Sequence, residues 1–567
     1  MPHKTERALR KSGKTIKTTT VLRRPGHSSP NEWTMRMRVG PDRWYLGRGL
    51  KDDIFRRLPF YITDYFDGVR GPKSIQKLLS TVVFLYFACI LPSIAFGVLN
   101  HDNTNGSFGV KQAVFAQAFG GIFFAIFGGQ PMIILVTTVP VAIYVKIIYI
   151  ISADLNHNQD NKHFMAMYAC VGLWAQFFVI FYAFVELSNI MKFATRSTEE
   201  IFSIFMALAF VVESFKALNA DFSKYYHSPH CGDTIRSNNG TFVKSPHKNM
   251  TMGQRPMLAV DKERCHRETT FHPCSPFLTR AKRELLADFA LPVAVIVMSI
   301  TGTWGFKGVK QDQFHYKHGA IGTLINVSNL PSSHVFLCMG LGFCLSFLFF
   351  MDQNITSSIV NNPQNKLKKG VTTHLDLLIV GFLNIALSLY GLPWMYAALP
   401  HSPLHLRALA DVEERVAQGH VHEVITNVRE TRLASLIAHV LILVSALLML
   451  PEPLIYIPRS VLDGLFLYMA VTSVNGNEMF ERILLLFTEQ AAYPPTHYIR
   501  RVPQRKVHLF TVCQLIQLCI LCSFGFAPYP YIEMVFPLVC FCFLPVRHLL
   551  IPRLIDYKFL DALDGRH

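Results

Sequence analysis

The chain has 567 residues, of which 51% are hydrophobic and only 16% are charged, and its mean hydropathy is positive. A soluble chain of this length would carry more charge, so the composition excludes an ordinary soluble protein and predicts a membrane protein. The net charge of +17 does not indicate nucleic acid. Its basic residues lie between apolar stretches and in the N-terminal tail, as the positive-inside rule expects.

Apolar stretches of up to about twenty residues recur along the chain, and their lengths suit a bilayer core about 30 Å thick. Many are short or carry Gly and Pro, as in transporters with broken helices. The sequence predicts an all-α polytopic membrane protein, with a basic cytoplasmic N-terminal tail (1–72), a transmembrane domain (73–550) and a cytoplasmic C-terminal tail (551–567). The stretches are 79–99, 112–127, 131–151, 165–185, 201–212, 286–304, 335–351, 375–394, 436–450, 461–474, 507–526 and 531–544.

Two stretches contain a Pro preceded by a hydroxyl residue, a pattern typical of a helix start. Thr137 and Thr138 precede Pro140, and Ser402 precedes Pro403 in the second half of the chain. Pro presets the first helical turn, and Thr or Ser can cap it. If both helices begin near mid-membrane, their N-termini form one site that attracts an anion or stabilises a carboxylate.

Asp352 lies in an apolar stretch, and Thr356 follows on the same helical face. A carboxylate at membrane depth costs several kcal/mol unless it is paired, protonated or hydrated, so such acids usually mark a transport pathway. The alternative is an acid at a helix end that reaches the interface. Because the chain has no phosphate loop, nucleophile elbow or nucleotide fingerprint, nothing in its sequence supports an enzyme.

The polar loop 219–283 combines three of the twelve cysteines with five histidines. The mixture resembles a zinc site, but no ligand spacing recurs. We therefore predict neither a metal site nor a cofactor.

At several motifs the chain resembles the bicarbonate transporter family, which includes the band 3-like anion exchangers and the sodium–bicarbonate cotransporters. Its run from Pro400 to His405, together with Val412-Glu413-Glu414-Arg415-Val416, resembles the sodium borate cotransporter-like branch. The other matching motifs are Gly129-Gln130-Pro131, Ser197-Thr198-Glu199-Glu200-Ile201, His374-Leu375-Asp376-Leu377, Gly464-Leu465-Phe466-Leu467-Tyr468-Met469 and the run from Pro494 to Pro503.

This resemblance implies a homodimer of fourteen-segment protomers, each built as an inverted seven-plus-seven repeat with a core domain and a gate domain. Substrate would lie between the third and tenth segments, and Asp352 would be the substrate-site acid on the eighth. The protein would span the plasma membrane with both termini in the cytoplasm. Its end, Phe559-Leu560-Asp561-Ala562-Leu563-Asp564, matches the family's acidic tail motif only in part, so carbonic anhydrase is not predicted as a partner.

Two departures from the family pattern bear on the substrate. His401 matches an anion-binding arginine of the chloride–bicarbonate exchangers, and Arg407 matches a second acid of the sodium-coupled members. A carboxylate near an imidazole suits proton or hydroxide movement. The predicted substrates are small inorganic ions: borate, hydroxide or proton, bicarbonate, or ions linked to ammonia. The alternative is chloride–bicarbonate or sodium–bicarbonate transport. A second histidine, His405, follows His401 on the same segment and either joins the site or packs between helices.

Sequons at Asn105, Asn239, Asn249 and Asn326 are candidate glycosylation sites, and the resemblance places their loops outside. Asn249 and Asn326 must then be separated by an even number of crossings, yet only the stretch 286–304 lies between them. The family's sixth segment is therefore predicted to be missing, through splicing or an imperfect gene model. This opens another alternative: a truncated isoform that does not transport, or an inhibitory dimer subunit.

Overall fold

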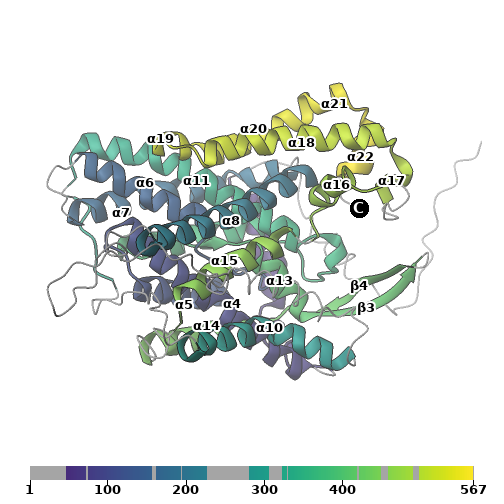
Figure 1. The fold of residues 1–567 in the computed structure, drawn as a ribbon, viewed down its shortest axis with the longest axis horizontal. Helices are drawn as coiled ribbons and strands as arrows, with labels where there is room; N and C mark the ends of the chain where they lie inside the picture. Colours follow the sequence, from purple (N-terminus) through teal and green to yellow (C-terminus); the bar gives the residue numbers. More distant parts are fainter. Residues whose placement is uncertain are drawn as a thin grey trace, which may run out of the picture. The chain divides into compact units, whose positions relative to one another are not determined.

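The structure is a computed structural model, and long helices dominate it (Figure 1). Many of these helices are apolar. Among the described residues, seven helices are long and apolar enough to cross a membrane. This agrees with the predicted polytopic fold, because a helix rising 1.5 Å per residue needs about twenty residues to span a bilayer core. The structure describes residues 46–71, 74–155, 161–192, 195–226, 280–305, 322–328, 330–417, 420–448, 457–474, 476–489 and 497–565.

The elements follow one another in this order. The α-helices are α2 (Arg48–Arg57), α3 (Thr63–Phe66), α4 (Ser74–Asn103), α5 (Val110–Phe127), α6 (Val139–Leu155), α7 (Asn161–Phe184), α8 (Arg196–Tyr226), α10 (Arg280–Ile300), α11 (Ser332–Val360), α12 (Thr373–Leu389), α13 (His401–Leu409), α14 (Leu433–Leu448), α15 (Arg459–Val474), α16 (Glu478–Leu485), α17 (His497–Arg501), α18 (Gln504–Gly525), α19 (Pro530–Glu533), α20 (Phe536–Leu549), α21 (Ile551–Leu554) and α22 (Tyr557–Asp564). The strands are β1 (Leu135–Val136), β2 (Tyr396–Ala397), β3 (Ala410–Ala417) and β4 (His420–Val428).

One bundle, called here the first bundle, contains α4–α7 and α11–α14. Within it α7 packs on α11 and α12, and α5 packs on α4 and α14. Glycine permits the close approach of these helices. A Cβ at Gly342 would lie 2.8 Å from Cβ of Trp174, and one at Gly121 would lie 1.9 Å from Cδ2 of His439.

The second bundle contains α8, α15, α16, α18 and α20, with α15 and α18 packed against α8. One of its buried charges is Arg482, which is fully covered and pairs with Glu200. The Arg482 guanidinium also lies over the Phe510 ring, 5.3 Å from its centroid. These contacts satisfy a charge that would otherwise be costly to bury.

The end of the chain folds onto this second bundle. Asp564 accepts a hydrogen bond of 2.6 Å from the backbone N–H of Ser197, at the start of α8, and pairs with Arg547. Leu560 and Leu563 of α22 are buried. Residues 551–565 of the expected C-terminal tail therefore cap and cover the second bundle instead of extending from it.

The segment before α4 folds onto the first bundle. Asp53 on α2 accepts hydrogen bonds from the backbone N–H groups of His374 (2.9 Å) and Leu375 (3.2 Å), so it caps the start of α12. Burial raises the pKa of Asp53 to about 7, although these N–H groups act in the opposite direction.

A buried charge cluster completes this attachment. Asp64 is fully buried and pairs with Arg57 (2.8 Å), Lys369 (2.7 Å) and Arg432 (3.0 Å). Glu430 lies 3.3 Å from Arg57 and balances part of the excess positive charge. The cluster joins segments that are more than three hundred residues apart in sequence.

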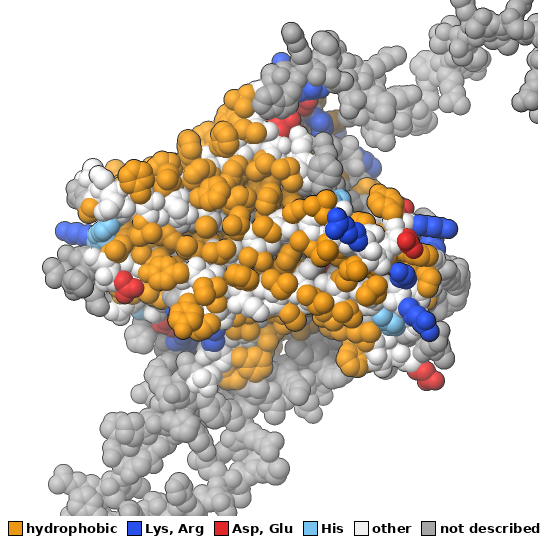
Figure 2. All heavy atoms as spheres, turned by 90° about the horizontal axis from the view of Figure 1, so that it is seen from above, with side chains coloured by type: hydrophobic (Ala, Val, Ile, Leu, Met, Phe, Trp, Pro, Cys, Tyr) orange, Lys and Arg blue, Asp and Glu red, His pale blue; other side chains and the backbone are white. Residues whose placement is uncertain are grey.

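The face in Figure 2 is almost continuously hydrophobic, with charged side chains gathered toward its two ends. On α18, the side chains of Val512, Ile516 and Ile520 are all exposed along one side of the helix. An exposed apolar surface with polar ends is typical of a protein that faces lipid.

The antiparallel hairpin β3–β4 departs from a purely helical prediction. It contains Val412 and Val416, which belong to the motif that resembles the sodium borate cotransporter-like branch. Valine favours a pleated backbone, which explains the strand. The predicted loss of a sixth segment, the sequons at Asn239 and Asn249 and the cysteines of the polar loop fall within 227–279, outside the described residues.

Candidate ion-binding site

The two predicted helix breaks meet inside the first bundle. Strand β1 pairs antiparallel with β2, so that Leu135 lies opposite Ala397 and Val136 opposite Tyr396. Helix α6 begins shortly after β1, and α13 begins shortly after β2. This confirms the prediction of two half-helices whose N-termini converge at one place.

Two buried amides hold the breaks in corresponding ways. Gln117 on α5 donates to the carbonyl of Leu135 (2.8 Å) in the first break. Asn384 on α12 donates to the carbonyl of Met395 (2.7 Å) and accepts from its N–H (2.9 Å) in the second. In lipid every exposed backbone group must find an internal partner, so these amides make the irregular backbone tolerable.

The loop before β1 is held by two buried charges. Asp376 accepts hydrogen bonds from the N–H groups of Gly129 (2.6 Å) and Gln130 (3.2 Å). Arg432 donates to the carbonyls of Gly128 (2.6 Å) and Gly129 (3.1 Å). The loop is thus held from both sides, because the Arg432 cation binds its carbonyls and the Asp376 carboxyl binds its N–H groups.

The polar residues of α13 cross-link the two breaks. The Ser402 hydroxyl accepts from the N–H of Ile134 (3.0 Å), so it joins the breaks instead of capping its own helix. The His405 Nδ1–H donates to the carbonyl of Met132 (3.1 Å). These contacts support the packing alternative for His405.

His401 lies at the start of α13, and its ring is directed toward α4. Its Nε2–H donates to the carbonyl of Ala88 (3.1 Å), while Nδ1 has no hydrogen-bond partner among the described residues. No described contact joins His401 to Asp352, so the predicted carboxylate–imidazole pair is not a direct one in this conformation.

Asp352 is 4% exposed on α11, and its carboxyl is hydrogen-bonded to the Tyr396 hydroxyl. The same hydroxyl is hydrogen-bonded to Thr138, directly before α6. Within the described chain, Oδ2 of Asp352 has no partner and no Lys or Arg pairs with the carboxyl. The Asp352 carboxyl and the Tyr396 and Thr138 hydroxyls therefore form a buried, hydrogen-bonded row from α11 to the start of α6.

The turn of α11 after Asp352 docks on β2. The Gln353 side chain accepts from the N–H of Ala397 (3.0 Å), and Thr356 donates to its carbonyl (3.2 Å). Thr137 donates to the carbonyl of Trp394 (3.0 Å). Thr356 and Thr137 thus have backbone partners here, whereas Nε2 of Gln353 has none among the described residues.

Arg407 lies outside this buried group of side chains. It is on the exposed side of α13, whereas His401, Ser402 and His405 on the same helix are buried. The structure thus brings Asp352, Thr356, Thr137, Thr138 and the buried α13 residues close to the β1–β2 pair, but it does not place Arg407 with them.

The second bundle covers the site through α20. The Phe541 ring of α20 lies 6.3 Å from that of Phe350, two residues before Asp352. Tyr144 on α6 donates to the carbonyl of Met534, just before α20. The site therefore lies where the two bundles meet.

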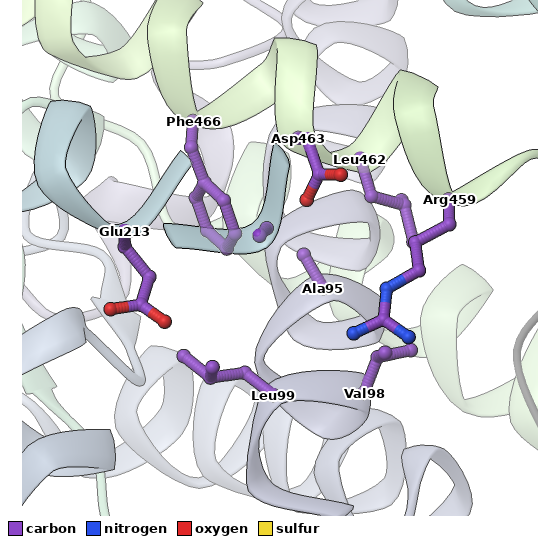
Figure 3. A pocket seen from close by; sticks show the side chains of 9 residues that line it. Ala95, Val98, Leu99, Glu213, Arg459, Leu462, Asp463 and Phe466 are labelled. Carbon is purple, nitrogen blue, oxygen red and sulfur yellow. The ribbon is translucent and has the colours of Figure 1, made fainter. Parts of the chain in front are cut away.

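A separate small pocket lies at another junction of the bundles, lined by α4, α8 and α15 (Figure 3). Arg459, Asp463 and Glu213 give it charge, and Phe466 forms an apolar wall. Arg459 also pairs with Asp102 at the end of α4. Asp352 is not among the residues that line this pocket, so the pocket is not part of the candidate site.

Sequence reasoning missed Tyr396, Gln353, Gln117 and Asn384. Gln117 and Asn384 lie within apolar stretches, Gln353 and Tyr396 each lie two residues past the end of one, and all four side chains are buried. That placement was the available signal, because a buried polar group in a membrane segment needs a partner. The sequence could not show that Gln117 and Gln353 would bond the strands β1 and β2. Nor could it show that Asn384 would bond Met395, or that Tyr396 would bond Asp352 and Thr138.

A family model described as the HCO3− transporter integral membrane domain matches residues 45–273 and 270–567. The chain belongs to this family. The predicted resemblance to the bicarbonate transporter family is confirmed.

Among individual family members, Solute carrier family 4 member 11 from Mus musculus is 43% identical over 590 residues, with 97% of this chain and 67% of that protein covered. The protein of the same name from Homo sapiens is also 43% identical, with 92% and 63% covered. Human Band 3 anion transport protein is 30% identical, with 91% and 55% covered. The chain thus spans between about half and two thirds of the length of these relatives.

Solved structures show the same fold at low sequence identity. The transmembrane domain of the cyanobacterial bicarbonate transporter BicA matches with a TM-score of 0.50 and 15% identity, covering 82% of this chain and 97% of that domain. The murine Solute Carrier 26 family member A9 anion transporter, in its inward-facing state, matches with a TM-score of 0.51 and 15% identity, covering 94% and 77%. These likenesses support the inverted-repeat fold.

Proposed function

We propose that this protein moves small inorganic ions across the plasma membrane by alternating access, with protons or hydroxide as a transported or coupled species. The observation that carries the proposal is the buried row Asp352–Tyr396–Thr138. It joins a carboxyl on α11 to the start of the half-helix α6, at the junction of the two bundles.

The chemistry of this row favours protons over chloride. Its O–H groups can exchange protons along the hydrogen bonds, and a buried carboxyl is a typical proton site in transporters. The Tyr396 hydroxyl bonds Thr138 just before α6, where the helix N-terminus would otherwise favour an anion. His401, the first residue of α13, is directed to a carbonyl of α4 instead.

Proton flux into vesicles containing the purified protein tests the proposal. We expect Asp352→Asn to abolish the flux or strongly change its pH dependence, and Tyr396→Phe to reduce it, with normal folding in both variants. Tyr182→Phe is the matched control, because Tyr182 is also a buried tyrosine of the first bundle, bonded to Ser346 (3.0 Å). Unchanged flux and pH profile in Asp352→Asn would make this carboxyl a bystander.

His401 supplies a second test of proton coupling. Nδ1 of His401 has no partner among the described residues, so His401→Gln should change the pH dependence of transport between about pH 6 and 8 if this nitrogen takes part in proton movement. An unaltered profile over that range would assign His401 to packing against α4.

Borate or bicarbonate cotransport is the alternative substrate choice within the family. The relatives include proteins named Band 3 anion transport protein and Sodium bicarbonate cotransporter 3. Chloride-dependent bicarbonate flux at a rate comparable with the proton flux would refute the preference for protons. The alternative of a non-transporting subunit is tested by a transcript that spans the codons from about Asn249 to Phe271. A transcript that contains the missing segment favours the transporter, and a faithful short transcript favours the non-transporting subunit.

We further propose a homodimer with cytoplasmic termini and glycosylated outer loops. Asn105 and Asn326 are both exposed, as glycosylation requires. Sugar at Asn105 and Asn326 would support the outer placement of both loops. Sugar at Asn249 and Asn326 on one molecule would require a second crossing between them and would refute the loss of the sixth segment.

A further inference from the structure

A pair of histidines lies at the N-terminal ends of α7 and α11, away from the candidate ion site. Nε2 of His163 and Nδ1 of His334 are 3.2 Å apart, and the two rings are nearly perpendicular. His334 lies roughly 27 Å along α11 from Asp352, at 1.5 Å per residue. Both side chains are partly buried, so a small solute can reach them.

The spacing fits a transition-metal ion. Zinc binds imidazole nitrogen at about 2.0–2.1 Å with tetrahedral geometry, which places two ligand nitrogens about 3.3 Å apart. Imidazole is also a preferred ligand of copper and nickel. The two nitrogens face each other in a hydrogen bond here, so both rings would have to turn for their lone pairs to converge on one ion.

A third residue orients one of these rings. The Ser152 hydroxyl, at the far end of α6, lies 2.9 Å from Nδ1 of His163. When Nδ1–H donates to this hydroxyl, Nε2 carries the lone pair that faces His334. Histidines that bind metals almost always donate the other ring N–H to a carboxylate, a backbone carbonyl or water, and loss of this partner weakens binding. The Ser152 hydroxyl takes the place of that acceptor here.

We propose that His163 and His334 form a binding site for Zn²⁺ or a similar transition-metal ion, oriented by Ser152, with water completing the coordination. The site joins the ends of α6, α7 and α11. The exposed sequon Asn326 lies six residues before α11, so the site would face outside if that loop does. The alternative is a simple N–H···N hydrogen bond that locks the helix ends together.

Metal binding by the purified protein tests the proposal without any transport assay. We expect Zn²⁺ to raise the thermal stability of the wild type, and bound Cu²⁺ to show electron paramagnetic resonance couplings to two imidazole nitrogens. His163→Gln and His334→Gln should each abolish both effects. Ser152→Ala should weaken Zn²⁺ binding by about tenfold, because it removes the orienting partner.

His101→Gln is the matched control, since His101 lies at the end of another helix of the same bundle, α4. It should bind Zn²⁺ like the wild type. Stabilisation by Zn²⁺ that persists in both His163→Gln and His334→Gln would overturn the proposal, and so would a wild type that Zn²⁺ does not stabilise. If the glutamine variants fail to fold, the Ser152→Ala titration decides: unchanged affinity would leave the pair a structural hydrogen bond.

Discussion

Replacement of Arg432 by Met should destabilise the protein strongly, because this side chain holds the loop that leads into the first broken helix. Arg432 is 1% exposed and pairs with Asp64. It donates to the carbonyls of Ala125 (3.1 Å), Gly128 (2.6 Å) and Gly129 (3.1 Å). Met has a similar length and no donor, so these three carbonyls would lose the guanidinium.

The magnitude follows from the bonds that are lost. Asp64 keeps Arg57 at 2.8 Å and Lys369 at 2.7 Å, so its charge stays paired. Each buried carbonyl left without its donor costs roughly 1–3 kcal/mol, so three of them give a loss on the order of 3–9 kcal/mol. Because proteins are typically stable by only about 5–15 kcal/mol, this is a large part of the total.

Thermal unfolding of the purified protein in detergent measures this loss. Arg48→Met is the control, because Arg48 is partly exposed and lies 3.9 Å from Asp52, a surface pair worth about 0–1 kcal/mol. Arg432→Lys should fall between Met and wild type, since an ammonium cannot reproduce the planar fork. An Arg432→Met protein that unfolds at the wild-type temperature would refute the reasoning.

Three further predictions concern the attachments of the bundles. Asp53 has a pKa of about 7 in the folded protein and about 4 in the unfolded chain, so its protonated form stabilises the fold at low pH. This contribution, on the order of 4 kcal/mol, is lost as the pH rises through 7. Asp53→Asn should therefore flatten the decline in thermal stability between about pH 4 and 7. Gly121→Ala should unfold far more easily than Gly464→Ala, because a Cβ at Gly121 meets His439 at 1.9 Å whereas one at Gly464 meets nothing within 4 Å. Asp564→Ala should make the C-terminal helix accessible to carboxypeptidase, since it removes the cap of α8 and leaves a buried arginine unpaired.

The membrane helices and the helix breaks could be predicted because their signals are local. Apolar runs of spanning length identify the helices, and a hydroxyl before Pro140 or Pro403 identifies the half-helix starts. Asp352 could be predicted for the same reason, since one carboxylate in an apolar run is visible without any knowledge of its neighbours.

The partners of these groups could not be predicted, because they come from distant parts of the chain. The Asp64–Arg432 pair spans 368 positions. Tyr396 looked like one more aromatic residue in an apolar run, and only the strand register directs its hydroxyl to Thr138. His401 was matched to an anion site by its position, yet its ring contacts α4.

The two ends of the described chain are attached to different bundles, and this offers a direct view of transport motion. The segment that contains Asp53 is fastened to α12, whereas the segment that contains Asp564 is fastened to α8. Leu46 is 61% exposed and Tyr557 is 76% exposed, so each can carry a spin label without disturbing a buried contact. The distribution of distances between the two labels would then follow the opening and closing of the membrane domain, with the ion path left untouched.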